Sequence, residues 1–222
     1  MVARRRFETL DELLKRLGNI PPERVRMNPP PGTATKWDLI RFRGPGQYEL
    51  VDRVIVSKGL SPYRGYLVAR FAMHIGDIAD RRRGGALFGP GAWVELAPGV
   101  VRNPDVSFIP WKRLQNRRVP MVQIGRIAPT LAVEILSPSN TRKEMRVKLK
   151  EYFLGGVKIV WMIDPEVRTA EEYTAPDAVT AIPADGELDG GDVLPGFALP
   201  LAELFAKLPA PAAKKPGKKK KK

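Results

Sequence analysis

The chain of 222 residues carries 38 Lys and Arg against 24 Asp and Glu, which gives a formal net charge of +14, and it contains no cysteine. Disulfides, cysteine-based zinc sites and cysteine nucleophiles are therefore excluded. The length allows one domain with an arm, and no run approaches the roughly 18 apolar residues that a membrane span needs. These features predict a basic globular protein of the cytoplasm with no membrane partner.

The first forty residues predict a short helix followed by an extended arm. Thr9-Leu-Asp-Glu12 is a capping box that opens a helix over residues 10–17. Residues 20–35 are rich in proline, which removes backbone donors and favours extended structure. We therefore expect an N-terminal helix and proline-rich arm over residues 1–40.

The C-terminal residues 209–222 form a lysine-rich tail, with seven lysines from Lys214 to Lys222. Such a segment cannot bury apolar surface and repels itself, so we expect it to be disordered. It either binds phosphate backbones nonspecifically or only keeps the chain in solution.

The intervening residues predict an α/β fold. Apolar residues after Pro62 recur at helical spacing over about 18 residues, and a second helix is expected from about Thr141 to Phe153. A fully apolar strand at 157–163 indicates the centre of a sheet that is covered on both faces. Strands are expected within 48–58, on both sides of a turn at Asp52-Arg53, and at 86–96, 104–109, 130–136 and 157–163. From the long helix onward the expected order is αβββαβ.

Two carboxylates interrupt apolar strands. The two-residue period puts Asp105 on one face of its strand with Ser107, and it puts Glu134 on the same face as Ala132. A buried carboxylate needs a partner, and two on adjacent strands would form an oxygen site for Mg²⁺ or Mn²⁺. Such an ion would polarise a phosphodiester and supply hydroxide. Alternatively, Asp105 caps a strand end and Glu134 pairs with an arginine.

The second helix adds a lysine. At 100° per residue, Lys148 lies at the edge of the apolar stripe beside Tyr152, whereas Lys150 points the other way. The Lys148 ammonium either reaches solvent or turns toward the carboxylates, where it would stabilise the charge on a pentavalent phosphate or orient water. Asp, Glu and Lys together are typical of one class of nucleases.

Several segments together resemble the Uma2 family of restriction-endonuclease-like proteins. The resemblance is carried by residues 104–108, 131–139 and 148–165, continues through 48–52 and 188–197, and covers most of 8–208. It implies a PD-(D/E)XK nuclease domain over 41–208, with an αβββαβ core and a mixed central sheet flanked by helices. It also implies a divalent metal, Mg²⁺ or Mn²⁺, between Asp105 and Glu134.

The chain departs from the family pattern at several positions. The usual lysine two residues after the glutamate is Leu136 here, and the resemblance implies that its role moved to Lys148. The family tends to carry acidic residues or His where this chain has Lys36, Ser57 and Arg64, and a Gly at the position of Arg53. Glu49 is retained, and lies either close to the site or on a solvent-facing strand position.

Three functions remain open from the sequence. The first is a metal-dependent DNA endonuclease with Asp105, Glu134, Lys148 and Glu49 at its site. The second is a catalytically impaired nuclease fold that acts as a basic DNA-binding module, and the third is a protein-binding domain whose lysines only prevent aggregation. A homodimer is expected for the endonuclease, because many nucleases cut two strands with two sites and symmetric pairs are the commonest oligomers.

Overall fold

A six-stranded sheet forms the centre of the computed structural model, which describes residues 7–81 and 84–209. The strand order is β10-β9-β8-β7-β6-β3. β7 and β8 pair in parallel, and the other neighbouring strands pair antiparallel, so the sheet is mixed, as predicted. Its strands are β3 (Gly85–Phe88), β6 (Val106–Pro110), β7 (Leu131–Ile135), β8 (Ile159–Asp164), β9 (Thr169–Ala175) and β10 (Ala178–Ile182).

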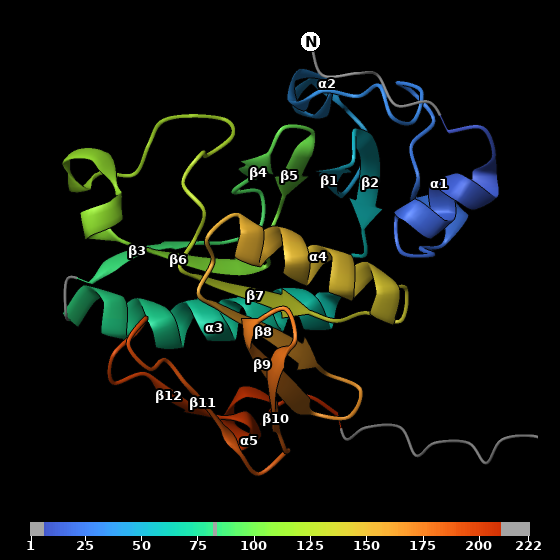
Figure 1. The fold of residues 1–222 in the computed structure, drawn as a ribbon. Helices are drawn as coiled ribbons and strands as arrows, with labels where there is room; N and C mark the ends of the chain where they lie inside the picture. Colours follow the sequence, from blue (N-terminus) through green and yellow to red (C-terminus); the bar gives the residue numbers. More distant parts are fainter. Residues whose placement is uncertain (1–6, 82–83, 210–222) are drawn as a thin grey trace, which may run out of the picture.

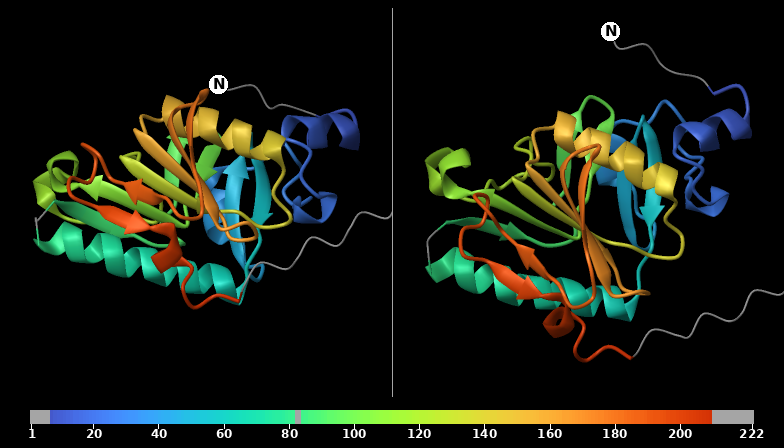
Figure 2. Two further views of the ribbon diagram at one scale, coloured as in Figure 1. Left: turned by 90° about the horizontal axis from the view of Figure 1, so that it is seen from below. Right: turned by 60° about the horizontal axis from the view of Figure 1, so that its bottom comes forward.

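Helices cover both faces of this sheet, which confirms the predicted α/β class. α3 (Pro62–Arg81) lies on one face and α4 (Arg142–Leu154) on the other (Figure 1). The C-terminal elements β11 (Glu187–Asp189), β12 (Ala198–Pro200) and α5 (Leu201–Leu204) lie on the α3 side (Figure 2). α4 joins β7 to β8, as expected for a helix that connects two parallel neighbours.

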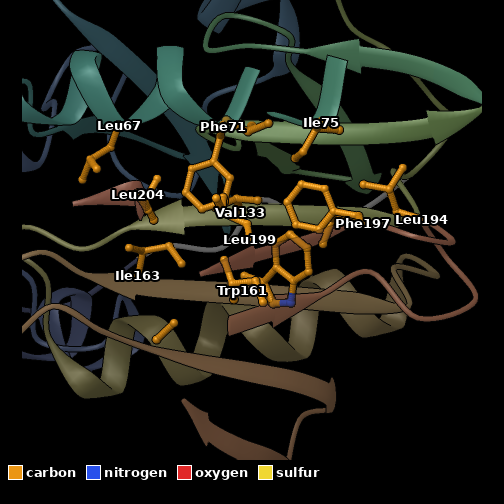
Figure 3. Close-up of a cluster of buried hydrophobic side chains, with 14 of the residues drawn as sticks. Leu67, Phe71, Ile75, Val133, Trp161, Ile163, Leu194, Phe197, Leu199 and Leu204 are labelled. Atoms are coloured by element: carbon orange, nitrogen blue, oxygen red, sulfur yellow. The ribbon is translucent and has the colours of Figure 1, made fainter. Parts of the chain in front are cut away.

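The face under α3 is an apolar core centred on Trp161. The Trp161 ring lies 6.4 Å from the Phe71 ring and 5.4 Å from the Phe197 ring, measured between centroids, and both pairs are stacked (Figure 3). The indole Nε1 donates to Glu172 at 2.7 Å, so its polar atom is satisfied. The removal of these large aromatic side chains from water stabilises the fold.

The face under α4 combines a smaller apolar cluster with charged side chains. Ala132, Val160 and Met162 from the sheet pack against Met145 and Leu149 of α4. Along β7, alternate residues face α3, and the residues between them, which include Glu134, face α4. This alternation follows the predicted period of two.

A second sheet of four strands lies beside the first, in the order β2-β1-β5-β4. Its strands are β1 (Gln47–Val51), β2 (Val54–Lys58), β4 (Val94–Ala97) and β5 (Val100–Arg102). The predicted hairpin turn at Asp52-Arg53 is confirmed, and both residues have positive φ, 46° and 64°. The prediction of one strand over 86–96 was wrong, because Gly89-Pro90-Gly91 divides this run between the two sheets.

The N-terminal segment packs against the second sheet. α1 (Leu10–Arg16) begins after Thr9, whose side chain accepts from the Glu12 amide, as the capping box predicted. Apolar residues of the segment contact β1 and β2. The 3₁₀ helix η1 (Pro22–Arg24) follows, and α2 (Lys36–Arg41) was not expected. These contacts join the first residues that the structure describes to the body of the molecule.

The predicted disordered tail lies outside the described residues, apart from Pro209. Within residues 7–81 and 84–209, each helix is too short or too polar to cross a membrane.

Candidate active site

Asp105, Glu134 and Lys148 converge on the α4 face of the central sheet. Asp105 directly precedes β6, and its Oδ2 accepts from the Ile135 amide of β7 at 2.7 Å. Glu134 lies within β7, and its Oε1 accepts from the Tyr152 hydroxyl at 2.5 Å. Lys148 extends from α4 and places its Nζ 2.9 Å from Glu134 Oε2. All three side chains are buried.

Glu49 joins this group from the second sheet and does not face solvent. Its Oε1 lies 3.1 Å from Lys148 Nζ and accepts from the Asn103 amide at 3.0 Å. Its Oε2 accepts from the Arg102 guanidinium at 2.8 Å. The two sheets therefore meet at the candidate site, because Glu49 and Arg102 come from β1 and β5 and the other acids from the central sheet.

Lys58 lies between the carboxylates, a position that sequence reasoning missed. Its Nζ donates to Asp105 Oδ1 at 3.1 Å, to Glu134 Oε2 at 3.2 Å and to the Asn103 carbonyl oxygen at 2.5 Å. Its side chain is 4% exposed. Lys58 lies at the end of the apolar strand Val54–Lys58, where a lysine is usually expected to reach solvent, so the sequence gave no signal for this position.

Two arginines complete the network. Arg64 contacts Asp105 Oδ1 from Nη2 at 2.5 Å and from Nε at 3.0 Å. Arg102 binds both Glu49 and Glu151. Both oxygens of Asp105, Glu134 and Glu49 therefore accept at least one hydrogen bond.

The charges in this network balance, with four acids against four bases. Burial alone would raise the pKa of Asp105, but Lys58 and Arg64 hold it below its ordinary value. Burial likewise opposes ionisation of Glu49, yet Lys148, Arg102 and Lys58 hold its pKa far below the ordinary range. Burial lowers the pKa of Lys58, but Asp105, Glu134 and Glu49 outweigh this effect and raise it. The acids are Glu49, Asp105, Glu134 and Glu151, and the bases are Lys58, Arg64, Arg102 and Lys148.

An apolar groove of about 850 Å³ lies next to this network. Ser107, two residues after Asp105 on the same strand, lines it together with Gly91, whose amide donates to the Asn103 side chain. Trp37 and Met121 also line the groove and are 56% and 99% exposed. The groove thus approaches the buried charges without being lined by the carboxylates themselves.

The donor atoms at the site suit a hard divalent cation. Carboxylate and carbonyl oxygens from Asp105, Glu134 and Asn103 all contact one point, and the ammonium of Lys58 stands there as a cation. In the part of the chain that the structure describes, no group of three or more acidic, His or Cys side chains is arranged to hold a metal.

A family model matches most of the chain. The model of the Uma2 family, described as "Putative restriction endonuclease", matches residues 36–202, which include all the residues of the charged network. This chain belongs to the Uma2 family. The family is therefore one of nuclease-type proteins, as the sequence resemblance indicated.

A solved structure is similar to this Uma2 chain. It is titled a putative nuclease belonging to DUF820 from Anabaena variabilis, and the match has a TM-score of 0.68 at 18% sequence identity. The match covers 78% of this chain and 97% of that chain. At this identity the similarity shows that the fold is shared. A comparison with curated proteins gave no match.

Proposed function

We propose that this Uma2 protein is a nuclease that hydrolyses phosphodiester bonds of DNA with Mg²⁺ or Mn²⁺ held by Asp105 and Glu134. The observation that carries the proposal is the convergence of Asp105, Glu134 and Lys148 from three separate elements. Two carboxylates and a lysine around one cation position match the requirements of metal-assisted phosphoryl transfer. The family membership of the chain agrees with this reaction class.

Each residue of the site has a defined part in this reaction. A bound divalent ion would polarise the phosphodiester and lower the pKa of a water molecule. The Ile135 amide fixes Asp105, and the Tyr152 hydroxyl occupies one oxygen of Glu134, so the other oxygen points into the site. The Lys148 ammonium supplies positive charge for the transition state, and Glu49 holds it in position.

The groove and its basic surroundings support nucleic acid as the substrate. Lys36 and Arg126 line the groove, where both lie within ion-pair distance of Glu95, and the short helices η2 (Trp111–Arg113) and η3 (Gln115–Arg117) nearby add further cations. Such side chains neutralise phosphates, and the exposed Trp37 ring offers a surface on which an unpaired base can stack. We place the DNA backbone along this rim, which leads toward Asp105.

The proposal is tested by cleavage of plasmid and single-stranded DNA with Mg²⁺, with Mn²⁺ and with a chelator. We expect metal-dependent cleavage that falls at least 100-fold in Asp105→Asn and Glu134→Gln, and that is unchanged in the control Lys150→Met, whose side chain is exposed. Circular dichroism checks that each variant is folded. The proposal is rejected if the wild-type chain cleaves neither substrate with either ion.

A second candidate function is a DNA-binding module that does not hydrolyse its ligand. It is favoured by the position of Lys58, which balances the carboxylates without a metal. This candidate predicts that the chain binds DNA more weakly as salt rises, and that Asp105→Asn binds DNA as well as the wild type does. Fluorescence anisotropy over a salt series, together with the cleavage assay, separates the two functions.

For the endonuclease we further propose a cytoplasmic homodimer. One site cannot contact both strands of a duplex at the same time, so two copies of the site would act on the two strands. Analytical ultracentrifugation with and without duplex DNA measures the oligomeric state, and a monomer under both conditions contradicts this part of the proposal.

A further inference from the structure

The ammonium of Lys58 stands where the proposed site would bind its metal ion. We propose that Lys58 is the resident cation of this site, so that a divalent ion binds only when the Lys58 side chain leaves. The inference rests on the proposed nuclease function, because it uses the same two carboxylates. It adds a competing group that the chain itself supplies.

The contacts of Lys58 resemble those of a coordinated cation. A lysine ammonium has three protons, and the Lys58 Nζ has three oxygen partners at 2.5, 3.1 and 3.2 Å. A Mg²⁺ ion needs its oxygen ligands at about 2.1 Å. The same oxygens cannot hold the ion at that distance while they also hold the ammonium. Binding of one cation therefore excludes the other.

The charge balance favours the arrangement in which the Lys58 ammonium, and not a metal ion, lies between the carboxylates. The four acids and four bases of the network already neutralise one another in a buried place. A divalent ion added to this arrangement would leave two uncompensated positive charges away from water, which is strongly unfavourable. Removal of the Lys58 charge instead leaves an excess of one negative charge beside an open position. The site then gains both the space and the charge that a cation requires.

The neighbouring cations do not reproduce the position of Lys58. Lys148 contacts Glu134 and Glu49, whereas Arg64 contacts Asp105. Among the residues that the structure describes, Lys58 is the cation whose ion pairs join Asp105 to Glu134. Lys58 is also the last residue of β2, so its release does not require the strand pairs before it to separate.

The test is a titration of the full chain with Mn²⁺, followed by isothermal calorimetry. We expect Lys58→Met to bind Mn²⁺ at least tenfold more tightly than the wild type, and the exposed control Lys150→Met to match the wild type. Mn²⁺ should raise the melting temperature of Lys58→Met by more than it raises that of the wild type. Equal Mn²⁺ affinity in the wild type and a folded Lys58→Met overturns the inference.

Crystals of the wild-type chain soaked in MnCl₂ decide the matter even if Lys58→Met does not fold. An anomalous peak between Asp105 and Glu134 with the Lys58 Nζ still beside both carboxylates overturns the inference. A peak accompanied by a displaced Lys58 supports it.

The cleavage assay keeps this inference distinct from the proposed function. If Lys58→Met gains Mn²⁺ affinity but neither it nor the wild type cleaves DNA, the inference holds and the nuclease proposal fails. If the wild type cleaves DNA and Lys58→Met has the wild-type Mn²⁺ affinity, the nuclease proposal holds and the inference fails.

Discussion

The two faces of the central sheet are built from the same strands but are stabilised differently. Under α3, Trp161 stacks with Phe71 and Phe197, and every large side chain of this cluster is apolar. Under α4, the apolar cluster is smaller and lies beside a network of eight charged groups, all of them buried except the half-buried Glu151. A buried charge needs its partners, because a buried charge left unpaired is strongly destabilising. The α3 face therefore stabilises the fold through apolar packing, whereas the α4 face depends on a defined set of ion-pair partners.

The largest effect is expected from the α3 face. Trp161→Ala should lower the free energy of unfolding by about 4 kcal/mol, because it leaves a cavity between two aromatic rings. Urea unfolding measures the change. Val179→Ala is the matched control, since Val179 is 52% exposed on β10, and it should change stability by less than about 0.5 kcal/mol. A small loss in Trp161→Ala would contradict the assignment of the α3 face as the main core.

On the α4 face, Arg102→Met should lower the free energy of unfolding by about 3 kcal/mol, because it leaves Glu49 and Glu151 without their shared partner. Adding Glu151→Gln should recover part of this loss, since it removes the charge of one of the two carboxylates that Arg102 binds. Urea unfolding of the single and double variants measures the coupling. If the two changes are additive, Arg102 and Glu151 do not act as a pair.

A pH-dependent effect is expected at the ion pair between the N-terminal segment and α4. Arg24 donates to both oxygens of Glu144, and although burial alone would raise the pKa of Glu144, these bonds hold it below its ordinary 4.5. The pair therefore stabilises the fold above pH 4.5, and this contribution, about 2 kcal/mol, is lost as the pH falls toward the lowered pKa.

Urea unfolding between pH 7 and pH 3 tests this expectation with Arg24→Met. The variant should be less stable than the wild type at pH 7, and the difference should narrow on acidification. A difference that stays constant over this range would show that Arg24 stabilises the chain by packing rather than through the charge of Glu144.

The smallest effect is expected at the start of α4. Thr141→Ala removes the side chain that accepts from the Glu144 amide and donates to the Gly18 carbonyl. This change should lower the free energy of unfolding by about 1 kcal/mol. Thr141→Ser keeps the hydroxyl and should retain most of the stability. Thermal unfolding compares the two variants, and equal losses in both would argue against a capping role.

The sequence predicted the arrangements that depend on local periodicity. The alternation in β7 put Glu134 on the face of Ala132, and the helical stripe of α4 put Lys148 at its edge beside Tyr152, because each pattern is a property of one element. The short α2 and β5 were missed, since six and three residues give too little periodic signal. The division of residues 86–96 between two sheets was also missed, because it depends on strand pairing.

The contacts of Lys58 and Arg64 could not be predicted from the sequence. Both residues belong to segments that reach the carboxylates only after the second sheet and α3 have packed against the first sheet. Sequence patterns describe the faces of an element, whereas these contacts join elements that are far apart along the chain. A lysine at a strand end is ordinarily solvated, so its position gave no warning of its burial.

The connection of β7 to β8 through α4 has a consequence for how the family can vary. A helix that joins two parallel neighbours has to return along their surface, so α4 lies over β7 whatever the sequence of the joining loops. This topology therefore brings Lys148 over Glu134. Substitutions in the loop of residues 136–141 should leave the ion pair between these two residues intact. The contacts of Lys58 do not follow from this connection, because Lys58 lies on β2 of the second sheet. We therefore expect Lys58 to be the member of the network that a relative can most easily replace.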